Sequence, residues 1–583
     1  MLTRSRVLGA VAALAALAPV APAAAAPLGA GVIPADRLTT WSPGIPGGIP
    51  AVTTVFRTID AAAYGDDRTD ATAAINGAIK AAGAVASAAR RQVVFLPAGR
   101  YRITGAIMLD RSHVVLRGAG PRLTHVRLDT KEDVSAVRVG VFWPDYRPAV
   151  AVVGSVPRGA RSITVADASG IQAGDVLQID QLDDPSYVVR GDQVYFKRGP
   201  RPTDAMGPSS PEGFRSVGQQ VEVASKQGNV LTLTGPTHIA FDAPFSPQVF
   251  KTATTREDEP GTRFTGLEDL RVTGGNNNNI FLMNVAYAWL RNVESDGDPA
   301  KGPGANGAHV ATIHAFRCEV RGCHVHHARK IDPGGGAYGI TISNQSSDNL
   351  VEDNIVRVLN KPIVLSGSGG GNVVAYNYVD DAIIAHHQTW QETAVDANHG
   401  SFAHHDLFEG NDTPNICSDS THGNSGWQTF FRNRATGMNG TAPRSLNIRA
   451  VGVDGFNREH TFVGNVLLQP GLKVDGERPI VLSTSRATGG VPAVYRIGAS
   501  TLGKSYESFD DGTALRLLLR HGNFDYVTNA VEWAPGLSRD LPPSLYLTAR
   551  PAFFGAELWP FVDPLREPKV GVLPARKRYE AMR

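Results

Sequence analysis

Histidines and carboxylates that could transfer protons are concentrated in one part of the chain. Eleven of the 16 histidines lie between residues 309 and 422, together with several Asp and Glu residues. Both residue types exchange protons in acid–base catalysis, and histidine does so near neutral pH. From this stretch the sequence predicts eight catalytic candidates: Glu392, Asp396, His399, His404, His405, Glu409, Asp419 and His422.

Aromatic and basic side chains of the same stretch could hold a ligand. Tryptophan offers a flat apolar surface on which a sugar ring can stack. Lysine and arginine could neutralise a carboxylate of the ligand. The predicted substrate-binding residues are Trp390, Trp427, Lys361 and Arg329. His399, His404 and His405 are an alternative metal site, but their spacing matches no zinc motif, so we expect no metal and no cofactor.

A repeat must position these residues. Hydrophobic pairs followed by asparagine recur with steps of 23, 34, 22 and 32 residues, at Asn354, Asn377, Asn411, Asn433 and Asn465. A step near 22–23 with short strands fits one coil of a parallel β-solenoid, in which stacked asparagines bond their neighbours. The longer step before Asn411 predicts an insertion, and such loops often carry function.

The same period relates two of the carboxylates. Asp396 and Asp419 are 23 residues apart, which predicts that they lie on adjacent coils. Carboxyl groups about 5 Å apart suit a retaining glycosidase, and about 6.5–9.5 Å suits an inverting one.

The rest of the chain divides by composition. Arg4, Arg6, an apolar run and Ala24–Ala26 are typical of a cleaved signal peptide, which predicts an exported, extracellular protein. The predicted parts are a signal peptide (1–26), an exposed leader rich in Pro and Gly (27–52), the start of the solenoid with a helix at 69–84 (53–155), a β-rich insertion (156–250), the main coils (251–470), and terminal coils with a cap (471–583).

Composition excludes several classes of protein. The 583 residues are 42% apolar and 19% charged, with a net charge of +2. A protein that binds nucleic acid needs a basic footprint, and a disordered chain needs more charge, so we expect neither. No segment after the signal peptide is long and apolar enough to span a membrane, so we expect no membrane partner. Three cysteines allow at most one disulfide.

The opening of the chain resembles a known superfamily. FRTIDAAAYGDDRTDATAAINGAIKAA, RQVVFLPAGRYRI and HVVLRGAG are similar to the start of pectate-lyase-superfamily proteins. That superfamily includes polygalacturonase-like hydrolases, glucanases, uronan epimerases, lyases and phage tailspikes. The resemblance implies an all-β fold, a right-handed parallel β-helix, here with an N-terminal capping helix and a small β-rich insertion. It also implies structural roles for Asp66, Asp67 and Asp70.

The chain departs from the best-known subfamilies. Asp380-Asp381, His399-Gly400 and His422-Gly423 echo parts of the polygalacturonase pattern, but no Asn-Thr-Asp precedes them and no Arg-Ile-Lys follows. No aspartate cluster of the calcium-binding pectate-lyase kind is present either. The resemblance therefore assigns no catalytic residue.

Three functions remain, each with a polysaccharide as partner. The favoured one is a secreted hydrolase that uses two carboxylates among Glu392, Asp396, Glu409 and Asp419. The alternative is a polysaccharide lyase, in which His399 or His422 abstracts the proton next to a uronate carboxyl group and Lys361 or Arg329 neutralises that group. The third is a glycan-binding or structural surface protein without catalysis. Fold alone does not choose among them.

Overall fold

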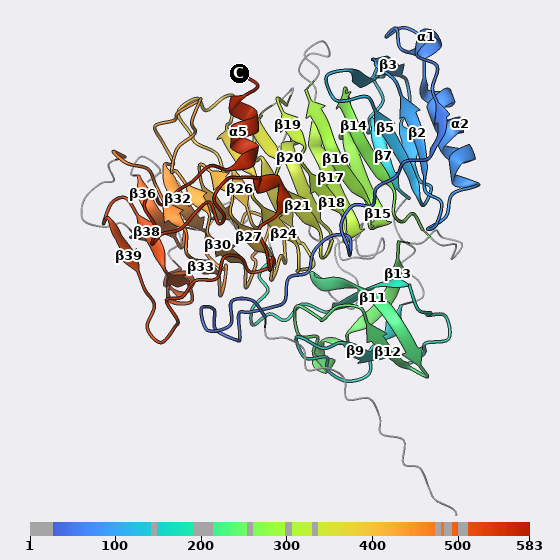
Figure 1. Ribbon diagram of the computed structural model, residues 1–583. Coiled ribbons are helices and arrows are strands. Elements are labelled where there is room, and N and C mark those ends of the chain that lie inside the picture. The colour runs from blue at the N-terminus through green and yellow to red at the C-terminus, as the bar shows by residue number, and fades with distance from the viewer. Residues whose placement is uncertain are drawn as a thin grey trace, which may run out of the picture.

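The computed structural model describes residues 27–141, 149–190, 214–253, 261–297, 306–328, 331, 336–472, 480–482, 492–499 and 511–583. The predicted signal peptide and Arg329 lie outside these residues. In the described part, the chain winds into a right-handed parallel β-helix, which confirms the predicted fold class. Figure 1 shows the coils stacked in chain order from the blue N-terminal end to the red C-terminal end.

One sheet of 22 strands forms two sides of the coil. Its first parallel run is β1 (Val55–Thr58), β2 (Gln92–Leu96), β5 (Val114–Gly118), β14 (Gly266–Thr273), β16 (Trp289–Asp296), β18 (Glu319–Arg321), β21 (Leu350–Glu352), β24 (Val373–Ala375), β27 (Leu407–Glu409), β30 (Thr429–Phe431), β33 (Thr461–Val463) and β37 (Leu519–His521). The second run shares β14 and β16 and adds β3 (Gly99–Ile103), β6 (Thr124–Leu128), β19 (His324–His326), β22 (Ile355–Leu359), β25 (Tyr378–Ala382), β28 (Asp412–Thr413), β31 (Arg434–Ala435), β34 (Val466–Leu467), β38 (Asn523–Asp525) and the antiparallel β39 (Ala530–Glu532).

A sheet of 11 strands forms the third side. In spatial order it contains β4 (Ile107–Leu109), β7 (Val137–Gly140), β15 (Ile280–Ala286), β17 (Asn306–Phe316), β20 (Gly336–Ser343), β23 (Ile363–Ser366), β26 (Val395–Asp396), β29 (Ile416–Ser418), β32 (Arg449–Val453), β36 (Ala493–Ile497) and β35 (Ile480–Leu482). Ile340, Ile363, Val395 and Ile416 stack in register and point into the core. Since side chains alternate along a strand, Asp396, which follows Val395 on β26, points outward.

The predicted asparagine stack is confirmed. Asn354 donates to Asn377 at 2.9 Å, Asn377 to Asn411 at 2.9 Å, and Asn411 to Asn433 at 2.9 Å. Asn433 and Asn465 continue the series, and Asn523 accepts from Asn465 as a further member. We call these six residues the asparagine ladder. Each side chain also bonds backbone groups, as Asn411 does with Val374, so the ladder satisfies the buried turn at this corner.

Few helices occur in the described residues: α1 (Ala61–Tyr64), α2 (Thr72–Gly83), α4 (Gly512–Arg516), α5 (Pro574–Glu580), and 3-10 turns at Ala243–Phe245 and Ala552–Phe554. Helix α2 is the predicted capping helix and buries Ile75, Ala78, Ile79 and Ala82 against the first coils. Asp70 accepts hydrogen bonds from both the backbone and the hydroxyl of Thr72 at its start. No helix of the described residues is long and apolar enough to cross a membrane.

The β-rich insertion is a separate sheet of β8 (Val150–Ala151), β9 (Ser162–Thr164), β10 (Val176–Gln181), β11 (Val217–Gln227), β12 (Val230–Leu233) and β13 (Gln248–Thr252). It hangs on one side of the solenoid (Figure 1). Polar contacts join the two, such as the Gln220 backbone N–H that donates to Ser347 Oγ at 2.9 Å.

Residues 27–52 are not the exposed leader that the sequence predicts. Trp41 and Ile45 are buried against the solenoid. Trp41 Nε1 donates to the His405 carbonyl at 2.9 Å, and Glu319 accepts from the Ile45 N–H at 2.8 Å. The prediction was wrong because Pro and Gly set the turns of this segment, whereas its few large apolar side chains find partners far along the chain.

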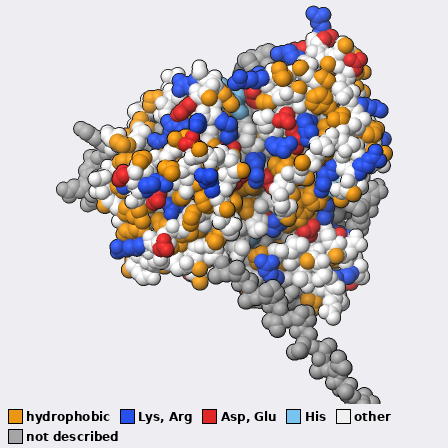
Figure 2. Space-filling model, viewed as in Figure 1, with side chains coloured by type: hydrophobic (Ala, Val, Ile, Leu, Met, Phe, Trp, Pro, Cys, Tyr) orange, Lys and Arg blue, Asp and Glu red, His pale blue; other side chains and the backbone are white. Residues whose placement is uncertain are grey.

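Surface charge and cysteines complete the description. On the face drawn in Figure 2, basic and acidic side chains are interspersed, in keeping with the net charge of +2. Cys318, Cys323 and Cys417 are buried free thiols.

Candidate active site

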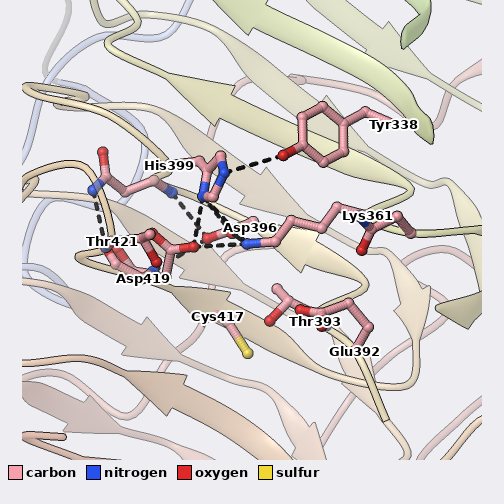
Figure 3. Close-up of polar contacts among 12 residues, drawn as sticks. Tyr338, Lys361, Glu392, Thr393, Asp396, His399, Cys417, Asp419 and Thr421 are labelled. Atoms are coloured by element: carbon pink, nitrogen blue, oxygen red, sulfur yellow. Dashed lines mark hydrogen bonds and ion pairs between the residues drawn. The ribbon is translucent and has the colours of Figure 1, made fainter. Parts of the chain in front are cut away.

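Four successive coils of the 11-stranded sheet bring polar side chains together on its outer face (Figure 3). Tyr338 lies on β20, Lys361 lies two residues before β23, Asp396 ends β26 and Asp419 directly follows β29. Val395 and Ile416 point into the core. Because side chains alternate along a strand, Asp396, one residue after Val395, and Asp419, three residues after Ile416, point away from it. With His399, which follows Asp396 by three residues, we call this set the charged row.

Lys361 is the centre of the charged row. Its ammonium contacts Asp419 Oδ2 at 2.6 Å and forms an ion pair with Asp396. The side chains are nearly removed from water, with 9% of Lys361, 0% of Asp396 and 7% of Asp419 exposed. A buried charge pair of this kind is stable only when each charge has a close partner.

The two carboxyl groups are driven to different protonation states. Burial, followed by the neighbouring Asp419, raises the pKa of Asp396 well above its ordinary value. Burial also acts on Asp419, but His399 and Lys361 outweigh it and lower the pKa of that group. Burial opposes the charge on Lys361, yet the two aspartates raise its pKa. The pKa values of the two carboxyl groups are therefore driven apart, upward for Asp396 and downward for Asp419.

His399 lies between the buried Asp419 and the Tyr338 hydroxyl and contacts both. Its Nδ1 lies 2.7 Å from Asp419 Oδ2 and its Nε2 lies 3.1 Å from the Tyr338 hydroxyl. A carboxylate accepts, so Nδ1 carries the proton and Nε2 presents a lone pair toward the tyrosine. Burial raises the pKa of Tyr338 to about 12, which keeps its hydroxyl protonated. The His422 ring is edge-on to the His399 ring, with centroids 4.7 Å apart.

Three residues of the charged row have side-chain atoms that could bind a metal ion. Ligand atoms of Asp396, His399 and Asp419 lie within 4.8 Å of one another. Lys361 Nζ already contacts both carboxylates, and His399 Nδ1 lies 3.3 Å from it. An ammonium therefore fills the position that a cation would take, and a metal would have to displace it.

Glu392 and Trp390 lie at the margin. The carboxylate of Glu392 accepts from the Thr393 N–H at 2.9 Å and contributes to the raised pKa of Lys361. Trp390 is half-buried and pairs through its backbone with Leu446. No described hydrogen bond joins either side chain to the charged row.

Three other predicted site residues, His404, His405 and Trp427, lie beneath the β-rich insertion, and the structure does not bring them together with the charged row. His404 Nε2 faces the Gly218 carbonyl at 3.1 Å, and burial lowers its pKa to about 3. The His405 ring stacks on Trp427, with centroids 5.4 Å apart. Trp427 also contacts Tyr187 of the insertion. These aromatic and histidine rings lie at the interface between the insertion and the solenoid.

Glu409, another predicted site residue, also lies apart from the charged row. It ends β27 in the 22-stranded sheet, and the C-terminal segment covers it. Its carboxyl oxygens accept from the Tyr376 hydroxyl at 2.8 Å and from the Leu545 N–H at 2.9 Å. Burial raises the pKa of Glu409 to about 7. The group anchors the C-terminal segment.

Tyr338 was missed by the sequence reasoning. It lies 23 residues before Lys361, which is the repeat distance, so the period itself contains the signal. Arg329, a predicted substrate-binding residue, lies outside the described residues.

Comparison with known proteins agrees with the opening of the chain. A family model described as rhamnogalacturonase A/epimerase, pectate lyase-like, matches residues 56–139. This segment holds α2 and the first coils, and the match confirms the resemblance to the pectate-lyase superfamily. No curated protein matches the sequence significantly.

Solved structures show weak overall similarity. The tailspike gp61 of Pseudomonas phage phi297 has 14% identity and a TM-score of 0.49, covering 69% of this chain and 58% of its own. The tailspike gp49 of Pseudomonas phage LKA1 has 16% identity and a TM-score of 0.44, covering 72% and 62%. The mannuronan C-5 epimerase AlgE6 A-module of Azotobacter vinelandii has 11% identity and a TM-score of 0.32, covering 81% and 93%. The chain thus spans about three fifths of either tailspike.

Proposed function

We propose that this chain cleaves an extracellular polysaccharide at a uronate residue by β-elimination, with His399 as the base. The observation that carries the proposal is the placement of His399 between Asp419 and Tyr338. The match of residues 56–139 to a rhamnogalacturonase/epimerase-type model supports a carbohydrate substrate. The signal-peptide pattern supports export.

His399 has the features of a positioned base. Asp419 fixes the tautomer with the proton on Nδ1 and stabilises the imidazolium that forms when Nε2 takes a proton. The His399 side chain is 13% exposed, more than Asp396, Asp419 or Lys361. A substrate can therefore reach the ring, while the carboxylate behind it stays buried.

Lys361 supplies the charge that elimination needs. An ammonium has three donors, and the two aspartates occupy two of them. Since His399 Nδ1 already bears a proton directed at Asp419, the third ammonium proton remains for the carboxylate of the substrate. That interaction stabilises the negative charge that develops next to the carboxyl group.

The reaction then balances within the site. His399 Nε2 removes the proton from the carbon next to the uronate carboxyl group. The electron pair of that C–H bond forms a carbon–carbon double bond, and the glycosidic C–O bond breaks. The Tyr338 hydroxyl gives its proton to the departing oxygen and regains one from the His399 imidazolium.

Hydrolysis, which the sequence favoured, is the second candidate. Asp396 and Asp419 are close, and their pKa values are driven apart, as a general acid and its partner require. Against this role, Asp396 is fully buried, and its oxygens already contact Lys361 and accept from the Asp419 N–H at 3.2 Å. Neither oxygen is exposed to solvent.

The test is a digest of neutral and uronate-containing polysaccharides, read by new reducing ends and by the ultraviolet absorbance of unsaturated uronates. We expect both signals on a uronate polymer and an approximately thousandfold loss in His399→Ala. The exposed His387→Ala is the matched control and should keep full activity.

Each other outcome overturns the proposal. Reducing ends without absorbance would establish hydrolysis. No signal on any glycan would favour a binding or structural role. Full activity in His399→Ala would place the chemistry elsewhere.

A further inference from the structure

A second group of histidines and carboxylates lies on the 22-stranded sheet. Asp296 ends β16 and pairs in register with His326, which ends β19. His326 Nδ1 lies 3.2 Å from Asp296 Oδ1 and 2.6 Å from His327 Nδ1. Three atoms that can each offer a lone pair thus face one another.

The backbone is shaped to bring the two histidines together. Consecutive residues of a strand point to opposite faces, so His326 and His327 would ordinarily diverge. His327 has φ 57, in the left-handed region that side chains rarely adopt, and this turns its ring back toward His326. Gly297 lies against this turn, where a Cβ atom would lie 1.7 Å from the His327 carbonyl oxygen. Strain of this kind is kept where the surroundings or a ligand require it.

Neighbouring groups orient the ligand atoms. His326 Nε2 faces Glu294 Oε1 at 3.4 Å, so when a metal takes the Nδ1 lone pair, the ring proton on Nε2 has a carboxylate to accept it. Arg271 contacts Glu294 at 3.3 Å and pairs with Asp296 through the other carboxylate oxygen, Oδ2. Carboxylates behind metal-binding histidines commonly act in this way.

We propose that Asp296, His326 and His327 bind a divalent transition-metal ion, with zinc as the best match. Their ligand atoms lie within 4.8 Å of one another. Two imidazole nitrogens and one carboxylate oxygen suit zinc, whereas calcium and magnesium prefer oxygen ligands alone. With metal–nitrogen distances of about 2.0–2.1 Å, tetrahedral ligands lie roughly 3.3 Å apart, so the two Nδ1 atoms need to separate by less than about 1 Å.

The site has one open side. Asp296 and His326 are buried, whereas His327 is exposed. Three protein ligands with an exposed edge leave a position for water or a fourth ligand. The charged row lies on the other sheet, so this proposal does not depend on the proposed cleavage reaction.

The test is calorimetric titration of the chelator-treated full chain, free of any histidine tag, with zinc chloride. We expect one tight zinc per chain. His327→Ala should bind at least tenfold more weakly, and since this side chain is exposed, the variant should fold. Glu294→Gln should weaken binding by about tenfold through the orientation of His326. The control is His386→Ala with His387→Ala, which removes an adjacent, exposed histidine pair elsewhere.

Zinc should also raise the melting temperature of the wild-type chain and of the control, but not that of His327→Ala. Absence of tight binding in the wild type, unchanged binding in His327→Ala, or loss of binding in the control would each overturn the site.

Discussion

The asparagine ladder and the charged row both stack side chains coil over coil, but they satisfy those side chains differently. In the ladder each asparagine meets another asparagine, so donors and acceptors match at every step. In the charged row Tyr338, Lys361 and Asp419 come from different coils, and the contacts that join them run through Lys361 and His399, between side chains of different types. Repetition gives stability, and departure from repetition places unlike groups within bonding distance.

The largest expected effect comes from removing the centre of the charged row. Lys361→Met leaves two buried carboxyl groups without their cation, so the free energy of unfolding should fall by about 3–5 kcal/mol, measured by urea denaturation. Adding Asp419→Asn should restore part of the loss, because it removes the orphaned carboxylate. A single variant as stable as the wild type would mean that this row carries no buried charge.

Removing a residue of the asparagine ladder should lower the free energy of unfolding somewhat less. Asn411→Ala removes the acceptor of the Asn377 N–H and side chain and the donor to Val374, all of them buried. We expect a loss of about 3 kcal/mol in urea denaturation, with unchanged turnover of the folded fraction. Lost turnover at full stability would reverse the roles of the two regions.

Glu409, a buried acid outside both regions, should make the stability of the chain depend on pH. Its pKa rises from 4.5 to about 7 on folding, so its contribution to stability is complete below pH 4.5 and is lost as the pH rises to about 7. Glu409→Gln should gain roughly 3 kcal/mol over the wild type across that window, measured as unfolding free energy against pH. The exposed Glu567→Gln should follow the wild-type profile.

The smallest effect on stability should come from Tyr338→Phe. It removes one hydroxyl at the edge of the charged row, so unfolding should change by less than about 1 kcal/mol, while turnover falls about a hundredfold. Tyr546→Phe is the converse control, because its hydroxyl bonds Glu352 under the C-terminal segment. It should lose about 1 kcal/mol and keep its turnover. Equal behaviour of the two variants would contradict the comparison.

The repeating parts could be predicted from the sequence, because each coil restates the same pattern. Asn354 to Asn465 and the capping helix at 72–83 follow from spacing and periodicity. Of the site, Asp396 and Asp419 follow from their separation of 23 residues, the length of one coil.

The rest depends on contacts between distant segments. His405 lies away from the charged row, where the Trp427 ring stacks on it and Trp41 bonds its carbonyl. The Glu409 carboxylate accepts a hydrogen bond from Leu545, which lies far along the chain. The local sequence around each residue does not predict contacts with segments so far away. The choice between His399 and a carboxylate pair also required the hydrogen bonds around each group.

The buried segment 27–52 also bears on the order in which the chain folds. Gly44 bonds Asp348, Trp41 bonds His405, and Arg37 bonds His460, which is 423 residues away. Asp348, His405 and His460 reach their folded positions only when the coils that contain them have formed, and contacts between residues so far apart in sequence form late. The coils can assemble neighbour on neighbour. We therefore expect segment 27–52 to dock last. It then contacts several coils at once and links them across the surface of the solenoid.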